Sequence, residues 1–256
     1  MTLAGVDLVI LGPAFIAGLL VITTHVPLGQ QVLRREIIFI DLAIAQIAGL
    51  GVLWAHSMHW RESAISVQLA AFSAALLGAF ALYIFERRWP DILEALIGTV
   101  FILAATAAIL ILANNPHGGE HLKDLLVGQI LWIDADQLAP VALLYAVILF
   151  IWFRFAAASR PLLFHVVFAL AITASVQLVG VYLVFASLII PAIAVRKARR
   201  HGLLIGYGLG AAAYAGGLLL SALLDLPAGA VIVWVLALFA VATSMVIGRY
   251  QRTSRD

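Results

Sequence analysis

The stretch from Leu162 to Val195 reads LLFHVVFALAITASVQLVGVYLVFASLIIPAIAV and contains no Asp, Glu, Lys or Arg. A helix needs about 20 apolar residues to cross the hydrocarbon layer of a membrane, so this run is too long for one ordinary span. Gly180 lies in its middle and Pro191 near its end, and both residue types interrupt helices. We therefore expect one long span followed by a short or broken helix, with the break near 180–191.

Seven further apolar runs are separated by short charged or turn-rich segments. Across all 256 residues the apolar fraction is 64% and the charged fraction 11%, whereas a soluble domain is about 45–50% apolar. A water-exposed fold of this length cannot bury so many apolar side chains, so a lipid bilayer must surround most of the surface. The sequence predicts an all-α, polytopic transmembrane helical bundle of eight to nine spans, forming a single domain over residues 1–256. The seven runs lie at 7–25, 37–57, 64–85, 92–113, 138–154, 202–224 and 228–248.

The motifs of soluble enzyme sites are missing from the sequence. It contains no GxxxxGK[ST] phosphate loop, no HExxH and no GxSxG, and it has no cysteine. This excludes ATP binding through a P-loop on this chain, thiolate metal sites and a cysteine nucleophile. We do not expect the chain to be an enzyme.

The Lys and Arg residues predict the orientation in the membrane. Of 15 basic residues, only Arg61 and Lys123 lie outside one alternating set of loops and the C-terminal tail. Cytoplasmic loops carry an excess of Lys and Arg. If the sixth run crosses twice, the N-terminus is outside and the C-terminus is in the cytoplasm. The other basic residues are Arg34, Arg35, Arg87, Arg88, Arg154, Arg160, Arg196, Lys197, Arg199, Arg200, Arg249, Arg252 and Arg255.

Asp41 is the notable acidic residue within an apolar run. A carboxylate within a span is costly and usually faces a cavity or a partner, so Asp41 is a candidate for a transport pathway. The alternative is an interfacial Asp paired with Arg34 or Arg35. Gln46 lies five residues on, about 140° around an ideal helix, so the two side chains share a face only if the helix is distorted.

Two groups of polar residues are candidate metal ligands near the predicted outer surface. His56 and His59 are three residues apart at the end of the second run, and His117, Glu120 and His121 stand together in the longest outer loop. Imidazole and carboxylate groups suit zinc, manganese or iron ions. Either group could collect an ion at a pore mouth, or both could be interfacial polar residues without a ligand.

Several stretches, in order along the chain, resemble the permease family of zinc, manganese and iron ABC importers, which includes the high-affinity zinc permease. The most specific is Val179-Gly180-Val181-Tyr182-Leu183-Val184 followed by Ser187-Leu188-Ile189-Ile190-Pro191-Ala192, which is similar to the family's V-G-x-x-L-V-x-A-L-L-I-x-P-A. The others are Pro27-Leu28-Gly29 through Val32-Leu33-Arg34-Arg35, Ala43-Ile44-Ala45-Gln46 with Gly51, Glu94-Ala95-Leu96-Ile97-Gly98, and Leu126-Val127-Gly128-Gln129-Ile130-Leu131.

The resemblance implies a permease subunit of the bacterial cytoplasmic (inner) membrane. It implies import of a divalent transition metal, with zinc first and manganese or iron as alternatives, and no covalently bound cofactor. The partners would be a cytoplasmic ATP-binding subunit, a periplasmic or extracellular metal-binding protein and a second copy in a homodimer; no nucleic acid is expected. Gly180 and Pro191 would form a hinge.

Two features depart from the family pattern. Gln46 stands where the family has a histidine, and an amide is a poorer ligand than imidazole for these ions. The loop from Arg154 to Arg160 lacks the family's D-P-x-x-A-x-x-x-G stretch, which is part of the coupling surface for the ATPase. Two alternatives therefore stay open: a stand-alone ion-coupled carrier or channel without an ATPase, and a membrane protein with a structural or assembly role.

Overall fold

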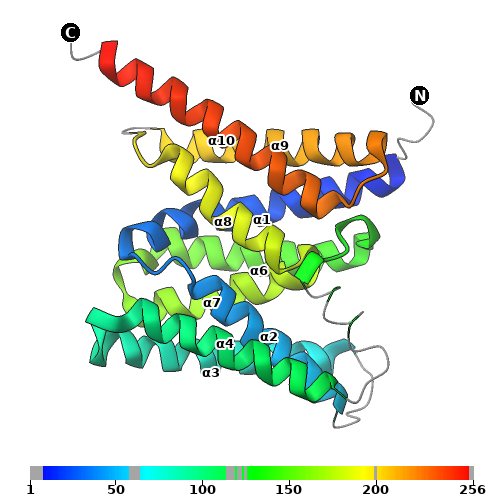
Figure 1. Cartoon of the computed structure of the whole chain (residues 1–256), viewed down its shortest axis with the longest axis vertical. Coiled ribbons are helices and arrows are strands. Elements are labelled where there is room, and N and C mark those ends of the chain that lie inside the picture. The colour runs from blue at the N-terminus through cyan, green and yellow to red at the C-terminus, as the bar shows by residue number, and fades with distance from the viewer. Residues whose placement is uncertain are drawn as a thin grey trace. The chain divides into compact units, whose positions relative to one another are not determined.

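The computed structural model describes residues 8–57, 64–113, 119, 123, 126–198 and 201–253. These ranges contain long α-helices joined by short connections, three short 3-10 helices and no strand (Figure 1). The long helices are α1 (Leu8–Arg35), α2 (Ile40–Ser57), α3 (Ala64–Arg88), α4 (Leu93–Leu112), α6 (Ala135–Arg154), α7 (Pro161–Val179), α8 (Val181–Val195), α9 (Gly202–Leu224) and α10 (Ala228–Thr253). The short ones are η2 (Pro90–Ile92), η3 (Ile130–Trp132) and η4 (Ala157–Ser159).

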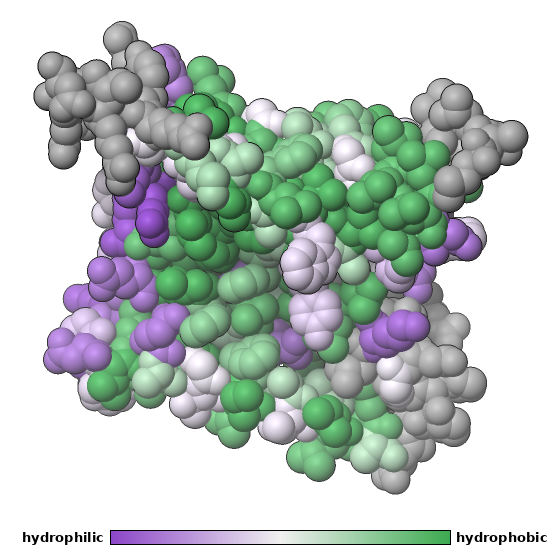
Figure 2. Space-filling model, turned by 45° about the horizontal axis from the view of Figure 1, so that its top comes forward, coloured by the Kyte–Doolittle hydropathy of each residue, from purple (hydrophilic) through white to green (hydrophobic). Residues whose placement is uncertain are grey.

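The helices have the length and surface of membrane spans, which confirms the predicted fold class. Seven of them are long and apolar enough to cross a bilayer, and α2 and α8 are shorter apolar helices. Large apolar side chains point outward from several of the seven, for example Leu77, Leu110 and Val246, which are 72%, 75% and 68% exposed. Figure 2 shows apolar residues over most of the visible face, with hydrophilic residues mainly towards its margins. Such a surface is stable only in contact with lipid.

The sixth apolar run breaks at a single residue. Helix α7 ends at Val179 and α8 begins at Val181, while Gly180 between them has φ 81° and ψ 162°. An L-residue with a side chain adopts this conformation only under strain, so glycine is required here. Pro191, by contrast, lies inside α8 and is buried there, and the helix continues to Val195. The predicted break is therefore confirmed at Gly180, whereas the backbone stays helical through Pro191.

A second glycine explains why the break has this geometry. Gly128 also has a positive φ of 70°, and its backbone lies directly against Gly180. A Cβ atom added to either glycine would overlap the backbone of the other segment. Two of the stretches quoted above, around residues 128 and 180, therefore meet in space although they are about 50 positions apart.

By internal contacts the chain divides into two compact units, and we describe each by itself. The first comprises residues 1–34, 127–145 and 178–256. Within it α9 packs on α10 and on α8, and it also packs closely on α1. A Cβ at Gly206 would lie 2.7 Å from Val26 Cγ1, and one at Gly210 would lie 2.5 Å from Ile22 Cδ1. Small residues of this kind let membrane helices approach each other closely.

The second unit comprises residues 35–126 and 146–177. Its centre is α2, which packs against both α3 and α4 (Figure 1). The contact with α3 is again close, because a Cβ at Gly51 would lie 2.7 Å from both the Ala70 carbonyl oxygen and Ala74 Cβ. The interpretation of residues 1–256 as a single domain stays a prediction.

Candidate functional site

Asp41 lies in the first turn of α2, immediately after the chain leaves α1. Glu36 takes a left-handed conformation (φ 59°) and ends α1 at Arg35, and α2 begins at Ile40. A carboxylate in a first turn interacts favourably with the free N–H groups and the dipole of the helix. Asp41 therefore lies where the dipole of α2 favours a negative charge.

The Asp41 side chain is 1% exposed, and neither of its oxygens has a hydrogen-bond partner among the described residues. Among the described residues, Asp41 does not form the ion pair with Arg34 or Arg35 that the sequence analysis gave as an alternative. Arg35 turns instead to Glu86, and Arg34 is exposed. Asp41 is therefore a buried acid without a basic partner in the described part of the chain.

Glu94 is the acidic neighbour of Asp41, and sequence reasoning did not single it out as a site residue. It lies in the first turn of α4, and its Oε1 accepts a hydrogen bond from the Phe39 N–H at 3.2 Å. It thus caps α2 from a different helix. Its Oε2 is buried without a hydrogen-bond partner among the described residues. The available signal was an acidic residue at the start of an apolar run, the same signal that drew attention to Asp41.

Gln46 is also buried in α2, with 4% exposure. Because α2 is a continuous α-helix from Ile40 to Ser57, the rotation of about 140° between positions 41 and 46 holds. The structure thus places both candidate pathway residues in one buried helix but on different faces of it.

The candidate metal ligands fall largely outside the described residues. His56 lies in the last turn of α2 and is exposed. His59, His117, Glu120 and His121 are not in the described ranges. Within those ranges no group of three or more His, Cys, Asp or Glu side chains is placed to hold a metal ion. Both proposed metal sites stay predictions.

Arg35 forms a polar cluster at the basic end of the second unit. Its Nη1 donates to Glu86 Oε1 at 2.6 Å, and its Nη2 donates to the Ala158 carbonyl oxygen at 3.0 Å. The guanidinium carbon lies 4.4 Å from the centre of the Phe164 ring. The cluster joins the ends of α1, α3 and η4, and the sequence could not reveal these pairings because the partners are about 50 and 120 positions apart.

Two further histidines, His25 and His165, are buried and each lies within hydrogen-bond distance of a carbonyl oxygen in the preceding helical turn. His165 Nδ1 lies 2.8 Å from the Pro161 carbonyl oxygen and 3.7 Å from Glu86 Oε2, so this side chain belongs to the Arg35 cluster. His25 Nδ1 lies 2.9 Å from the Val21 carbonyl oxygen. These contacts give both residues a role in the fold.

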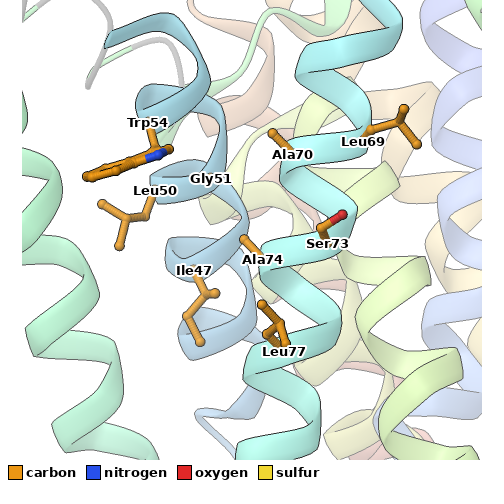
Figure 3. Close-up of a pocket in the computed structure, with 9 residues that line it drawn as sticks. All are labelled: Ile47, Leu50, Gly51, Trp54, Leu69, Ala70, Ser73, Ala74 and Leu77. Carbon is orange, nitrogen blue, oxygen red and sulfur yellow. The ribbon is translucent and has the colours of Figure 1, made fainter. Parts of the chain in front are cut away.

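A groove of about 400 Å³ runs between α2 and α3 (Figure 3). Its walls are mostly apolar side chains, among them Leu50, Trp54 and Leu77, with Gly51 at the contact between the helices and Ser73 on α3. A divalent cation needs several oxygen, nitrogen or sulfur ligands. The groove does not supply them, so it is an apolar surface feature and not an ion site.

Comparison with known proteins places this arrangement among transporters. The ABC 3 transport family matches residues 7–159 and 156–247. The structure of PsaBC from Streptococcus pneumoniae in complex with Fab is similar, with a TM-score of 0.74 and 20% sequence identity over 91% of this chain and 90% of that chain. An inward-facing conformation of an ABC transporter assigned to the metal-chelate type matches with a TM-score of 0.53 and 16% identity, over 91% of this chain and 77% of that chain. At these identities the two structures establish a shared fold.

Proposed function

The chain belongs to the ABC 3 transport family, and on that basis we propose that it is the membrane permease of an ATP-driven importer of a divalent transition metal. The observation that carries the proposal is the family match, which extends over nearly the whole chain. The resemblance to the zinc, manganese and iron permeases supports the substrate class, with zinc first and manganese or iron as alternatives. ATP hydrolysis would take place on a separate cytoplasmic subunit.

An importer of this kind would contain further proteins besides the permease. A cytoplasmic ATP-binding subunit would drive a pair of permease chains in the bacterial inner membrane, and an extracytoplasmic binding protein would deliver the metal. The basic loops support a cytoplasmic C-terminus and an outer N-terminus. These partners and this orientation are proposals that rest on the family and on the charge distribution.

Within the permease we propose that Asp41 and Gln46 lie along the transport pathway. Both are buried polar side chains in a membrane helix, where such groups are costly and usually functional. His56 with His59, and His117 with Glu120 and His121, would receive the ion on the outer side. Gly180 would be the hinge, because it is where the backbone leaves the helical conformation, with Pro191 beyond it in α8.

Radiometal uptake into proteoliposomes tests the importer. The permease would be reconstituted with its ATPase, and uptake of zinc, manganese and iron compared with and without ATP and the binding protein. Uptake of a metal that needs both ATP and the binding protein is the expected result. Uptake driven by an ion gradient alone, or failure to form a complex with any ATPase, would overturn it.

One observation favours a second candidate, a carrier that works without an ATPase. The loop between α6 and α7 carries only η4, a three-residue 3-10 helix, where the resembled family has its coupling stretch. A carrier needs no such surface. The proteoliposome experiment separates the two candidates, because only the importer requires ATP.

A further inference from the structure

The basic end of α3 carries a pocket to which the proposed function gives no role. The pocket has a volume of about 410 Å³ and is lined by Tyr83, Ile84, Arg87 and Arg88. Arg87 and Arg88 are the last two residues of α3, and both are exposed. Two guanidinium groups and a phenol beside an apolar side chain suit a ligand that has both an anionic and an apolar part.

The Arg87 side chain is held in place by Tyr83, one turn earlier on α3. Its Nη1 donates to the Tyr83 hydroxyl oxygen at 3.3 Å, and its guanidinium carbon lies 5.9 Å from the centre of the Tyr83 ring. Tyr83 is itself half-buried, and its ring packs edge-on against the His165 ring of α7, with 6.0 Å between the ring centres. Part of the pocket is therefore ordered before a ligand arrives, which lowers the entropic cost of binding.

The positive charge of this pocket is not neutralised within the described part of the chain. Neither Arg87 nor Arg88 forms an ion pair with a described residue, and the adjacent Glu86 is bound to Arg35 instead. Asp91 is the exposed acid nearby, and one carboxylate does not offset two guanidinium groups. The positive-inside rule accounts for basic residues at this end of the helix, but it does not require an arginine to be docked on a tyrosine. Both charges are therefore available to an anionic group.

An apolar stripe on the same side of α3 leads from the arginines into the membrane. Positions 77, 80, 84 and 88 are three or four residues apart and therefore lie on one side of an α-helix. Leu77, Phe80 and Ile84 are all exposed. The stripe continues into the apolar groove between α2 and α3, of which Leu77 is a lining residue (Figure 3). In a membrane helix such a stripe contacts lipid chains, which are as apolar as its side chains.

The length of the stripe matches one leaflet of a bilayer. The hydrocarbon core is about 30 Å thick, so the chains of a lipid in one leaflet extend about 15 Å into it. An α-helix rises about 15 Å over ten residues, and Leu77 lies ten positions before Arg87. Trp89, directly after the arginines, is exposed, as expected of an aromatic side chain at the level of the lipid headgroups. A phospholipid whose phosphate lies at the arginines would therefore have its chains along the stripe.

We propose that the basic end of α3 binds an anionic phospholipid of the leaflet that contacts the basic loops. The lipid phosphate accepts hydrogen bonds from Arg87 and Arg88, because guanidinium groups match the geometry of phosphate oxygens. The acyl chains follow the apolar stripe. A free phosphate or a nucleotide would use the arginines and leave the stripe without a ligand, so the observations favour a lipid. Lipid binding at this site does not depend on which substrate the chain transports.

Lipid titration of the purified full-length chain, followed by native mass spectrometry, tests the proposal. Phosphatidylglycerol is the anionic probe, and phosphatidylcholine, which has no net charge, is the neutral one. The unchanged chain should bind phosphatidylglycerol at a saturable site, and phosphatidylcholine about tenfold more weakly or less. The double variant Arg87→Gln/Arg88→Gln should bind phosphatidylglycerol about tenfold more weakly than the unchanged chain and lose the preference between the two lipids.

The matched control is the double variant Arg34→Gln/Arg160→Gln. It removes the same number of charges from two exposed arginines that do not line the pocket, and it should bind phosphatidylglycerol as the unchanged chain does. If both double variants lose affinity equally, net charge and not the pocket attracts the lipid, and the proposal is overturned. Equal affinity of the unchanged chain for the two lipids would overturn it as well.

The melting temperature provides a second readout, because a ligand that binds only the folded chain stabilises it. Added phosphatidylglycerol should raise the melting temperature of the unchanged chain and of the control, and it should not raise that of Arg87→Gln/Arg88→Gln. Each variant is compared with itself without lipid, so a general change in stability does not affect the result. A lipid-dependent rise that persists in Arg87→Gln/Arg88→Gln would contradict binding at this pocket.

Two further arms test other occupants of the pocket. Glycerol phosphate and inorganic phosphate should not displace phosphatidylglycerol, and displacement by either would show that the site takes free phosphate groups. If Arg87→Gln/Arg88→Gln keeps its lipid binding but no longer forms a complex with the ATP-binding subunit, the arginines serve a protein contact and the lipid site is wrong. The lipid titrations do not require transport, so a chain that fails as an importer leaves this site standing.

Discussion

At the residue scale, several charged groups of the second unit leave water by pairing with one another. Arg35 is the clearest case, since its side chain is 14% exposed and that of Glu86 is 21% exposed. Removing one partner of a buried ion pair leaves the other charge uncompensated, which costs more than the pair itself contributes. The two arginines at the end of α1 are adjacent in sequence but differ in this respect, which makes them a matched pair for experiment.

We predict that Arg35→Ala destabilises the protein and that Arg34→Ala does not. Arg35→Ala removes the bonds to Glu86 and Ala158 and the contact with the Phe164 ring, with an expected loss of about 2–4 kcal/mol for a mostly buried pair. Arg34 is exposed, so its loss should change stability by about 0.5 kcal/mol or less. Thermal unfolding of both variants in detergent is the measurement, and equal melting temperatures would contradict the role of the cluster.

At the element scale, the break between α7 and α8 and the packing of α9 are both decided by glycines. At Gly180 the reason is the backbone conformation together with the neighbouring Gly128. On α9 the reason is space, because α1 lies where side chains would otherwise be. At Gly180 even an alanine should be harmful, whereas on α9 the effect of a side chain should depend on whether the glycine faces α1.

We predict that Gly180→Ala disrupts the junction of α7 and α8. The alanine would need a positive φ, which costs on the order of 1–3 kcal/mol, and its Cβ would overlap Gly128. Gly98→Ala is the control, because Gly98 lies within α4 with open space around it, and alanine is favoured over glycine there. Expression and melting temperature should fall for the first variant and be unchanged or higher for the second. A Gly180→Ala protein as stable as the unchanged chain would show that the junction tolerates a side chain.

We also predict that Gly206→Leu weakens the packing of α9 on α1, whereas Gly208→Leu leaves it unchanged. The two positions are on the same helix, but Gly206 faces Val26 at close range and Gly208 has nothing within 4 Å. Overpacking a close contact typically costs about 1–3 kcal/mol. Chemical or thermal unfolding of the two variants would measure the difference, and a larger loss for Gly208→Leu would reverse the assignment of faces.

At the scale of the whole molecule, the distribution of charge predicts an orientation in the membrane, and the sequence provides a convenient background for testing it. The chain has no cysteine, so any introduced cysteine is the single reactive thiol. Exposed positions on both predicted sides are available, at Asp134 before α6 and at Arg196 after α8.

We predict that Asp134→Cys reacts with a membrane-impermeant maleimide in intact spheroplasts and that Arg196→Cys reacts only after the membrane is opened. The positive-inside rule predicts that the basic loops, including Arg196, lie on the cytoplasmic side. Transport activity of each variant would confirm that it is folded. The opposite labelling pattern would invert the predicted orientation.

The sequence by itself determined that this is an all-helical membrane protein, approximately where its helices lie, and that the sixth apolar run is interrupted near residues 180–191. These properties are local, because the length of an apolar run and the conformation of a glycine do not depend on distant residues. It also identified Asp41, since an acid within an apolar run stands out on its own.

Only the tertiary structure decided which helix faces are buried and which distant residues meet. In a soluble protein the apolar face of a helix marks the side that packs on the core. In a membrane protein both the lipid and the protein interior are apolar, so hydrophobic periodicity does not show that Gly206 faces α1 and Gly208 does not. The contacts of Arg35 with Glu86 and of the Phe39 N–H with Glu94 join residues about 50 positions apart, and such contacts arise from helix packing. The part of the site that the sequence missed is therefore the part that long-range packing creates.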